Sequence, residues 1–399
     1  MIRKRVGVVV GVLAAVALLV ATAQAGTRST KVTTVTLSGW SSGQDEDNLL
    51  QQVVDKFNAT HKSIHVDYSI INGDYPTAMT ARFAAHNAPD VFYVDSSVAG
   101  SWVRQGVLQP LNSYIKQSRY KTSKFFPTLL GAFTVGKQVC GFPKDWSPLA
   151  MEVNRGMLGQ AGGKAPKTWA QLQSVAQTMA NKNVVPGGKP ICLSPDWARM
   201  LAFIYQGGGS LSKLTSPAAI NAVNFYVGLI NKGLAATPDK LGSGWCGEAL
   251  GKGKAAIIFE GNWVIPFMNS TYPKTSYGIF PMIKDKTGGN LAFTVSYSMA
   301  KDSQNKQAAW TLLSWLTGKT GQKLWVSKGL ALPSRKDVKA IGGRQAFLGA
   351  APYAHGWGFG NPFFANAYTV MGNDLNAVIS GSKSVSSMMS DVSSALKGG

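Results

Sequence analysis

Apolar residues recur with two different spacings in the first third of the chain. Residues 33–40 are typical of a strand, and residues 64–70 alternate apolar and polar side chains as a half-buried strand does. Between them, residues 47–58 place apolar side chains on one face of a helix, and a second helix is indicated around residues 79–83. The apolar run 89–95 is typical of a strand buried on both faces. Strands that alternate with helices predict a doubly wound α/β domain.

Helix signals are more frequent in the second part of the chain. Thr168 and Gln171 form a capping box that opens a helix. Residues 255–260 predict a further apolar strand, and residues 306–316 predict a helix that is rich in tryptophan. The segment 380–394 is rich in serine, yet its apolar residues fall at helical spacing, which favours helix over disorder. We find no internal repeat.

The first 25 residues have the organisation of a secretory signal peptide. Basic residues at 3–5 precede an apolar stretch at 6–20, and residues 23–25 form a small-x-small cleavage site. The apolar stretch is shorter than the ~18–20 residues that a membrane span needs. No cysteine lies near the cleavage site, so there is no lipobox. We therefore expect cleavage near Ala25 and a periplasmic or extracellular, cell-surface-associated protein, whose length favours two domains over one.

Charge and cysteine counts narrow the function classes. The chain has 40 basic and 19 acidic residues and a net charge of +21, but its bases are scattered singly, so we expect no nucleic-acid partner. Two explanations of the charge stay open, namely work at low pH and attraction to an anionic cell surface. Three cysteines and four histidines show no metal-ligand spacing, and we expect neither a metal nor a cofactor. Export permits a disulfide.

One segment in the middle of the chain suits neither a core nor an ordinary loop. Residues 141–146 read GFPKDW and lead into an apolar run. A buried core would exclude Asp145 unless it were paired, and a solvated loop would have little use for Trp146. The segment therefore predicts a partly buried surface that borders an opening in the protein.

Four segments, in order along the chain, resemble regions of the family 1 extracellular solute-binding proteins. This family supplies the sugar-binding receptors of ABC importers and includes the maltose-binding-protein type. The segments are APDVFYVDSSVAGSWVRQGVLQPLNSYI (88–115), GKQVCGFPKDWSPLAMEVN (136–154), GKAAIIFEGNWVIPFM (253–268) and residues 303–335. The resemblance implies a two-lobed α/β periplasmic-binding-protein fold, type II-like, with lobes joined by crossing hinge segments. It also implies a monomer that binds a sugar between the lobes and delivers it to ABC transporter permease subunits.

The resemblance further implies how the chain divides. An N-terminal lobe is expected from residues 32–142 plus 259–312, and a C-terminal lobe from residues 143–258 plus 313–399. The chain would cross between lobes at 141–146, return near 259–263 and leave again around 310–318. Because Cys192 and Cys246 would both fall in the C-terminal lobe, we expect a disulfide between them, with Cys140 free at the crossing.

A sugar site needs aromatic rings that stack on apolar ring faces and polar groups that fix orientation. We predict ligand contacts from aromatic and polar residues that end strands, flank glycine, proline or aspartate, or match the family's aromatic positions. They are Trp40, Ser42, Gln44, Asp95, Ser96, Asp145, Trp146, Trp197, Trp245, Glu260, Asn262, Trp263, Arg335, Trp357 and Tyr368. Three tryptophans at helical spacing with leucine are instead predicted to be core: Trp310, Trp315 and Trp325.

Alternatives to sugar contact stay open for the charged candidates. Asp95 and Asp145 could cap a helix or form a hinge salt bridge, Glu260 could pair with a lysine across the lobes, and Arg335 could form an inter-lobe pair. A polyol-phosphate or glycerol-phosphate receptor would use Lys144 and Arg335 as a clamp, but no dedicated arginine pair or anion-binding glycine loop is present.

A secreted glycosidase is the rival from a different class. It would need two carboxylates ~5–10 Å apart, and Asp145 and Glu260 are the candidates. Carboxylates are scarce in the chain, and we expect no enzyme activity and no catalytic residue. The sequence does not encode which sugar is bound.

Overall fold

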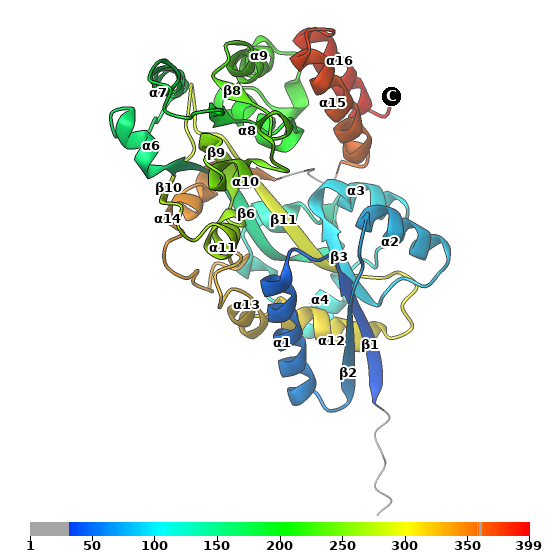
Figure 1. The fold of residues 1–399 in the computed structure, drawn as a ribbon. Coiled ribbons are helices and arrows are strands. Elements are labelled where there is room, and N and C mark those ends of the chain that lie inside the picture. The colour runs from blue at the N-terminus through cyan, green and yellow to red at the C-terminus, as the bar shows by residue number, and fades with distance from the viewer. Residues whose placement is uncertain (1–31, 357, 359–360) are drawn as a thin grey trace, which may run out of the picture.

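A computed structural model describes residues 32–356, 358 and 361–399. The predicted signal peptide and Trp357 lie outside the described residues. The described chain folds into two α/β lobes, one above the other in Figure 1, each with its own apolar core. The predicted α/β class with two lobes is confirmed. Within these residues, no helix has the length and apolar character that crossing a bilayer requires.

Strands from both lobes join one sheet. Among the described residues it has ten strands, with the order β2-β1-β3-β11-β6-β9-β7-β8 along its main path, while β10 pairs with β6 and β12 pairs with β11. The strands are β1 (Thr33–Gly39), β2 (Ile64–Ile70), β3 (Val91–Asp95), β6 (Gly141–Asn154), β7 (Lys189–Cys192), β8 (Ala235–Ala236), β9 (Ala255–Gly261), β10 (Tyr277–Phe280), β11 (Asn290–Met299) and β12 (Ala354–Gly356). A separate pair joins β4 (Thr134–Val135) to β5 (Gln138–Val139).

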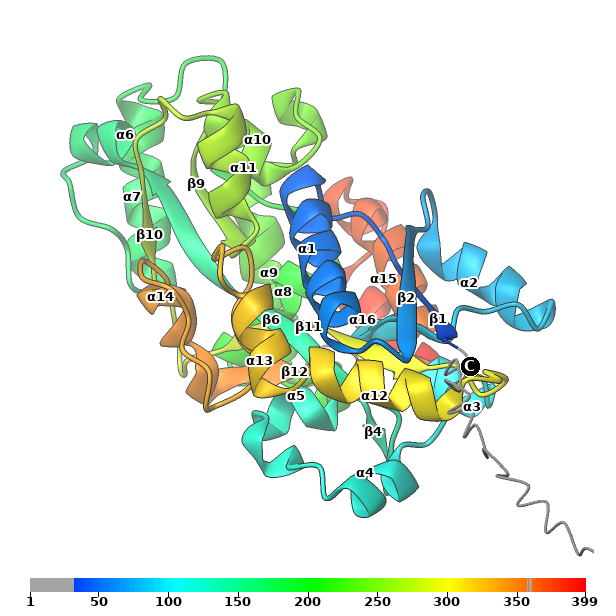
Figure 2. The ribbon, with the colours of Figure 1, turned by 90° about the horizontal axis from the view of Figure 1, so that it is seen from below.

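The N-terminal lobe is built as the strand and helix spacings predict. Strand β1 pairs in parallel with β2 and β3, and the apolar stripe of the first helix, with Leu50, Val54 and Phe57, packs into the core beneath them. The helices of this lobe are α1 (Gln44–Thr60), α2 (Tyr75–Ala84), α3 (Ser96–Arg104), α4 (Asn112–Ser118), α5 (Pro127–Gly131), α12 (Lys306–Leu316) and α13 (Lys319–Trp325). In Figure 2, α12 and α13 lie beside α1.

The C-terminal lobe carries the remaining described helices. Helices α8 and α9 pack on each other, and α15 packs on α16. The helices are α6 (Arg155–Gln160), α7 (Trp169–Asn181), α8 (Trp197–Gln206), α9 (Pro217–Asn231), α10 (Cys246–Gly251), α11 (Val264–Thr271), α14 (Gln345–Leu348), α15 (Phe364–Ile379) and α16 (Val385–Ala395). Short 3₁₀ turns lie at Thr122–Lys124, Leu211–Lys213, Asp239–Leu241 and Ala351–Tyr353.

Two long strands connect the lobes. Strand β6 contributes Phe142 to the N-terminal core and Leu149 to the C-terminal core, and the antiparallel β11 contributes Tyr297 and Leu291 in the same way. The predicted crossing at 141–146 therefore lies within β6. The chain returns through β11 and not near 259–263, because β9 remains paired with the C-terminal half of β6.

The third crossing lies later than 310–318. Leu313, Trp325 and Val338 pack in the N-terminal core, so the chain is still in this lobe at residue 338, and Leu332 on the way forms a bridge with Trp146 of β6. The apolar stripe of α12 explains this difference, because it packs against β1 and β11 and keeps the segment in the N-terminal lobe. The core assignments of Trp310 and Trp325 are confirmed, at 4% and 3% exposure. Trp315, in contrast, is only half-buried beside Phe57 and His61.

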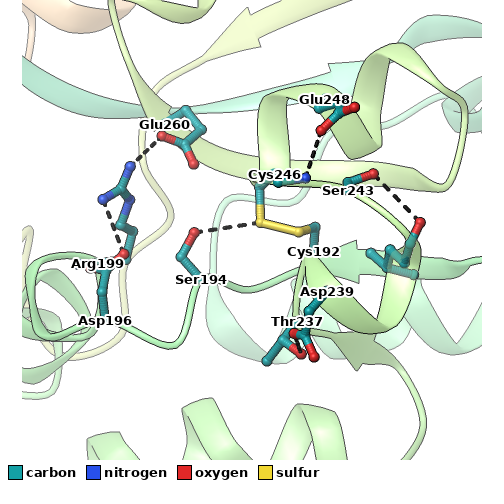
Figure 3. The surroundings of a disulfide bond; sticks show 12 residues. Cys192, Ser194, Asp196, Arg199, Thr237, Asp239, Ser243, Cys246, Glu248 and Glu260 are labelled. Carbon is teal, nitrogen blue, oxygen red and sulfur yellow. Dashed lines mark hydrogen bonds and ion pairs between the residues drawn. A yellow bond between two sulfur atoms is a disulfide. The ribbon is translucent and has the colours of Figure 1, made fainter. Parts of the chain in front are cut away.

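The predicted disulfide is confirmed. Cys192 at the end of β7 is bonded to Cys246 at the start of α10, as Figure 3 shows. Cys140 is free and buried, and burial raises the pKa of its thiol to about 11. The disulfide fixes the loop that carries Trp245 to the sheet of the C-terminal lobe.

Candidate ligand-binding cleft

A cavity of ≈ 770 Å³ lies between the lobes, where β6 and β11 cross from one to the other. Its volume falls in the range that small-molecule sites occupy. The residues that line it come from both lobes and from the crossing strands: Trp40, Ser42, Gly43, Gln44, Asp45, Glu46, Asp95, Lys144, Asp145, Trp146, Ser147, Trp245, Trp263, Pro266, Phe267, Ser270, Phe293, Thr294, Val295, Leu330 and Ala331. Predicted site residues among them are Trp40, Ser42, Gln44, Asp95, Asp145, Trp146, Trp245 and Trp263.

Aromatic rings on opposite sides of the cavity are held edge-on by other rings. Trp40 follows β1 and contacts Tyr75 and Tyr93, with ring centroids 5.1 Å apart in each case. On the other lobe, the Trp245 ring lies 4.7 Å from that of Phe267. Such edge-to-face pairs restrict a ring's orientation. The cavity therefore offers fixed apolar faces to a ligand from two sides.

The chain changes direction at Lys144 through a β-bulge. The β6–β11 register shifts between Val295, opposite Asp145, and Ser296, opposite Pro143, so Lys144 has no partner across the ladder. A bulge re-aims side chains and is common beside functional sites. Here the side chains of Lys144 and Asp145 both line the cavity.

Lys144 forms what we call the Lys144 group, with Glu46 and Asp145. Its Nζ lies 2.5 Å from Asp145 Oδ2 and 3.3 Å from Glu46 Oε1, which belongs to the first turn of α1. The ammonium also lies over the rings of Tyr93 and Trp325, 4.9 and 4.2 Å from their centroids. This group ties α1 to β6 at the base of the cavity.

Burial and the neighbouring charges shift the pKa values of Lys144 and Glu46. Burial alone would lower the pKa of Lys144, but the charges of Asp145 and Glu46 raise it well above its usual range. Burial raises the pKa of Glu46, against the opposing effect of Lys144. Lys144 therefore stays charged, and two carboxyl groups share its one positive charge.

A second group, the Arg199 group, lies behind the cavity wall in the C-terminal lobe. Arg199 donates to Glu260 Oε2 at 2.5 Å and to Asp196 Oδ2 at 3.0 Å, as Figure 3 shows. Trp263 Nε1 donates to the same Glu260 oxygen at 3.0 Å, and the guanidinium lies 5.8 Å from the Phe293 ring centroid. The Arg199 group therefore contacts Trp263 and Phe293, two rings of the cavity wall, from the side away from the cavity.

Glu260, a predicted ligand residue, is wholly buried in the Arg199 group and does not line the cavity. Burial raises its pKa, against the effect of Arg199. Glu152 lies next to it and accepts a hydrogen bond from the Glu260 backbone N–H at 3.1 Å. Burial and the charge of Glu260 raise the pKa of Glu152 well above its usual range. Glu260 thus pairs with Arg199 of its own lobe, and not with a lysine across the lobes, which was the alternative that the sequence left open.

Other predicted site residues lie in the packed interior. Trp197 is 1% exposed and stacks on Phe364 at 5.1 Å between centroids; it heads the apolar face of α8, so the neighbouring proline and aspartate indicate a helix start and not a loop tip. Ser96 is 1% exposed, in the first turn of α3. Neither residue lines the cavity.

The remaining candidates have structural partners near the crossings. Asn262 donates to Leu330 O at 2.6 Å and accepts from Arg344 Nε at 3.2 Å, which ties β9 to the third crossing. Arg335 forms a two-pronged pair with Asp337, only two residues away, and no inter-lobe pair is described for it.

Of the two remaining aromatic candidates, one does not line the cavity. Tyr368 on α15 is 40% exposed. Trp357 lies outside the described residues.

Sequence reasoning missed Asp45 and Glu46 as cavity residues, and it considered Lys144 only as a phosphate clamp. The acidic first turn of α1, directly after the polar loop that ends β1, was the available signal. A second cavity of ≈ 530 Å³ adjoins the first and shares Asp45, Pro266, Ser270 and Leu330 with it. The cleft thus extends along α1 beyond the tryptophan-lined part.

The arrangement favours binding over acid–base chemistry. Glu260 is buried behind Trp263, so its carboxylate and that of Asp145 cannot flank a glycosidic bond of a ligand in the cavity. Asp145 accepts from Lys144 and from Trp325 Nε1 at 2.8 Å. Among the described residues, no group of three histidine, cysteine, aspartate or glutamate side chains is placed to hold a metal ion.

The family model and the relatives found by sequence comparison agree on one family. The model of the family described as bacterial extracellular solute-binding protein matches residues 40–323. A probable sugar-binding periplasmic protein of Brucella suis is 25% identical over 347 residues, which cover 82% of this chain and 80% of that protein. A putative binding protein of Brucella abortus is 23% identical over 300 residues, which cover 72% of each.

Solved structures share the fold over nearly the whole chain. The ABC substrate-binding protein of Listeria monocytogenes in complex with cycloalternan has a TM-score of 0.81 at 18% identity, covering 92% of this chain and 98% of that one. The GacH receptor of Streptomyces glaucescens, solved unliganded and with acarbose, has a TM-score of 0.79 at 20% identity, covering 92% and 99%. UgpB of Mycobacterium tuberculosis with glycerophosphocholine has a TM-score of 0.79 at 18% identity, covering 90% and 97%.

Proposed function

The chain belongs to the bacterial extracellular solute-binding protein family, and from this premise we propose that it is an exported receptor that captures a sugar between its lobes and delivers it to the permease of an ABC importer. The observation that carries the proposal is the composition of the cavity. Tryptophans from both lobes and from the crossing line it together with carboxylates and hydroxyls. Apolar ring faces with polar groups at their edges are what a sugar requires.

The mechanism follows from where the cavity lies. A sugar that contacts Trp40 on one lobe and Trp245 on the other bridges the two and stabilises the conformation in which both can touch it. The lobes are joined by paired strands, so hinge closure is the available motion. The closed form is then the one that a permease recognises. Relatives and structural neighbours described as sugar-binding support this proposal.

A polyol-phosphate ligand is less well supported. Among the described residues, Lys144 is the one base that lines the main cavity, and it already lies between two carboxylates. Lys328 and Arg344 line only the smaller cavity beside it. Arg335, the other half of the clamp considered from sequence, pairs with Asp337 away from the cavity. The glycerophosphocholine-bound neighbour shares the fold at 18% identity. A similarity at this level of identity concerns the fold and says nothing about the ligand.

Export should be visible at the N-terminus of the secreted protein. We expect cleavage near Ala25, because the sequence before it has the three-part organisation of a signal peptide. N-terminal sequencing and intact mass of secreted material are then expected to give a chain that starts at or near Gly26, without lipid. Recovery of residues 1–25 on membrane-bound protein would contradict this.

Replacing Trp263 by alanine should weaken sugar binding about ten- to a hundredfold, an order-of-magnitude ~1–3 kcal/mol. The ring lines the cavity and is held in place by Glu260 and by Phe293, whose centroid lies 5.4 Å away. A thermal-shift screen of neutral mono- and oligosaccharides and of polyol phosphates would first identify a ligand, since a ligand that binds only the native state raises the melting temperature. Calorimetric titration then gives the affinity of each variant.

The control for this prediction is Trp315→Ala. That ring is also half-buried, but it lies on α12 against Phe57 and His61, away from the cavity. We expect normal affinity in the folded fraction of this variant. Equal affinities for wild type, Trp263→Ala and Trp315→Ala would show that the ligand binds elsewhere, and a screen in which no sugar raises the melting temperature would argue against the proposed function.

A further inference from the structure

Two tryptophans of the cavity wall rest on glycines. A methyl group at Gly247 would lie closer than 3.0 Å to three adjoining carbons of the Trp245 ring, Cζ2, Cη2 and Cζ3. A methyl group at Gly261 would meet Cε3, Cζ3 and Cη2 of Trp263 in the same way. An approach from the edge of a ring would bring one carbon much nearer than its neighbours, whereas here the three are nearly equally near. The face of each ring therefore covers its glycine.

The backbone does not require glycine at either position. Neither residue has the positive φ that favours glycine over other residues. Gly247 lies in α10, where alanine is the better helix former. Gly261 ends β9 in register with Leu149 of β6, and glycine weakens a strand. Each glycine therefore costs local stability, and the room that it leaves for a tryptophan ring is the structural reason for its presence.

The two rings are also confined by other side chains. The Trp245 ring meets that of Phe267 edge to face, at 4.7 Å between centroids. Trp263 meets Phe293 edge to face at 5.4 Å, and its Nε1 donates to Glu260 Oε2 at 3.0 Å. Both tryptophans line the cavity. A methyl group added beneath either ring would therefore push the ring into the ligand space or break these contacts.

We propose that Gly247 and Gly261 are positioning residues for the ligand, because each fixes the ring of a cavity tryptophan against the backbone and so determines where a sugar stacks. This rests on the proposed sugar-binding function and identifies residues that set its affinity. Neither glycine lines the cavity, so each acts through its tryptophan. A ring that is already in place loses little freedom when a sugar stacks on it, which raises the affinity.

Alanine substitutions at the two glycines test the proposal. The probe is the neutral sugar, among glucose, galactose, maltose, cellobiose and mannobiose, that the wild-type protein binds most tightly. We expect Gly247→Ala and Gly261→Ala each to weaken its binding about tenfold or more in calorimetry, because the displaced ring no longer meets the sugar face. In the Trp263→Ala protein, adding Gly261→Ala should change the affinity less than about twofold, since the methyl group then has no ring to displace.

Gly278→Ala is the matched control. Gly278 lies in β10, which pairs with β6 as β9 does. A methyl group there would lie 2.8 Å from the ring of Phe280, which follows two residues later as Trp263 follows Gly261. Phe280 does not line the cavity. This variant should therefore bind the same sugar within about twofold of the wild-type affinity.

A measurement without ligand shows whether the rings move. In protein labelled with fluorotryptophan, the fluorine NMR resonances of Trp245 and Trp263 are assigned by their loss in the Trp245→Phe and Trp263→Phe variants. Gly247→Ala should shift the Trp245 resonance and leave that of Trp263 in place, and Gly261→Ala should do the reverse. Gly278→Ala should move neither resonance. A role of the glycines in general stability would not produce this reciprocal pattern.

The outcomes separate this inference from the proposed function. If both glycine variants bind the sugar as the wild type does, or if Gly278→Ala weakens binding as much as they do, the inference is overturned and the sugar receptor stands. Unshifted tryptophan resonances would overturn it too, as would an equal loss of affinity from Gly261→Ala with and without the Trp263 ring.

A folding defect has a defined reading as well. If Gly261→Ala does not fold, the double variant with Trp263→Ala should fold, because the methyl group then has room. A double variant that also fails to fold would overturn the inference. If no sugar binds the wild-type protein, the proposed function fails and the inference fails with it.

Discussion

Replacing Arg199 by methionine should lower the free energy of unfolding by about 3–5 kcal/mol, which is the usual cost of removing one partner from a buried ion pair. The substitution leaves Glu260 wholly buried without its base and removes the partner of Asp196 as well. Urea denaturation followed by tryptophan fluorescence would measure the change. A loss below about 1 kcal/mol would show that solvent screens this pair as it does surface pairs.

The pH dependence of that loss has a defined sign. Burial raises the pKa of Glu260, and Arg199 opposes the increase, so the folded variant should hold a proton on Glu260 to higher pH. An unfolded glutamate releases its proton near pH ~4.3. The deficit of Arg199→Met should therefore be small below that pH and grow as pH rises toward neutrality. The control is Lys240→Met, because Lys240 pairs with Asp239 at the surface, with 78% and 68% of the side chains exposed, and should cost less than about 1 kcal/mol.

Replacing Trp197 by alanine should cost about 3–5 kcal/mol of stability. The ring is 1% exposed and stacks on Phe364, so its loss opens a cavity between α8 and α15 that neighbouring side chains fill only in part. Thermal and urea unfolding would measure the effect, with sugar affinity determined on the protein that remains folded.

Trp245→Ala is the matched control for this prediction. Trp245 lies next to the disulfide, is half-buried and lines the cavity. We expect it to lose affinity more than stability, while Trp197→Ala does the reverse. The same pattern of losses in both variants would mean that the structural division between core and cavity tryptophans does not describe their roles.

Much of the fold could be predicted because local spacing decides it. The stripe on α1, the buried run in β3 and the cap of α7, where Thr168 accepts from Gln171 N–H at 3.2 Å, all depend on residues close in sequence. The crossings could not be located as well. Whether α12 packs on the first or second lobe depends on which sheet face is open to it, and that is decided by strands more than 200 residues away, such as β1.

The candidate site was predicted in part for the same reason. Trp40 and Asp95 end parallel strands on one sheet edge, where α/β folds place ligands, and both line the cavity. Trp197 met a different local criterion, the proline and aspartate before it, but this aspartate, Asp196, caps a buried helix. The Lys144 group joins residues nearly 100 positions apart, and no local pattern signals such a contact.

The bulge at Lys144 also has a mechanical meaning. The paired strands β6 and β11 form a flexible connection between the lobes. The register shift beside Lys144 interrupts their hydrogen-bond ladder at one point. Paired strands bend most easily where their hydrogen bonds are interrupted, so we expect a hinge motion between the lobes to pivot beside Lys144, which also lines the cavity. A ligand that contacts Lys144 and Asp145 would therefore act close to this pivot. A small displacement there would produce a much larger displacement at the far ends of the two lobes.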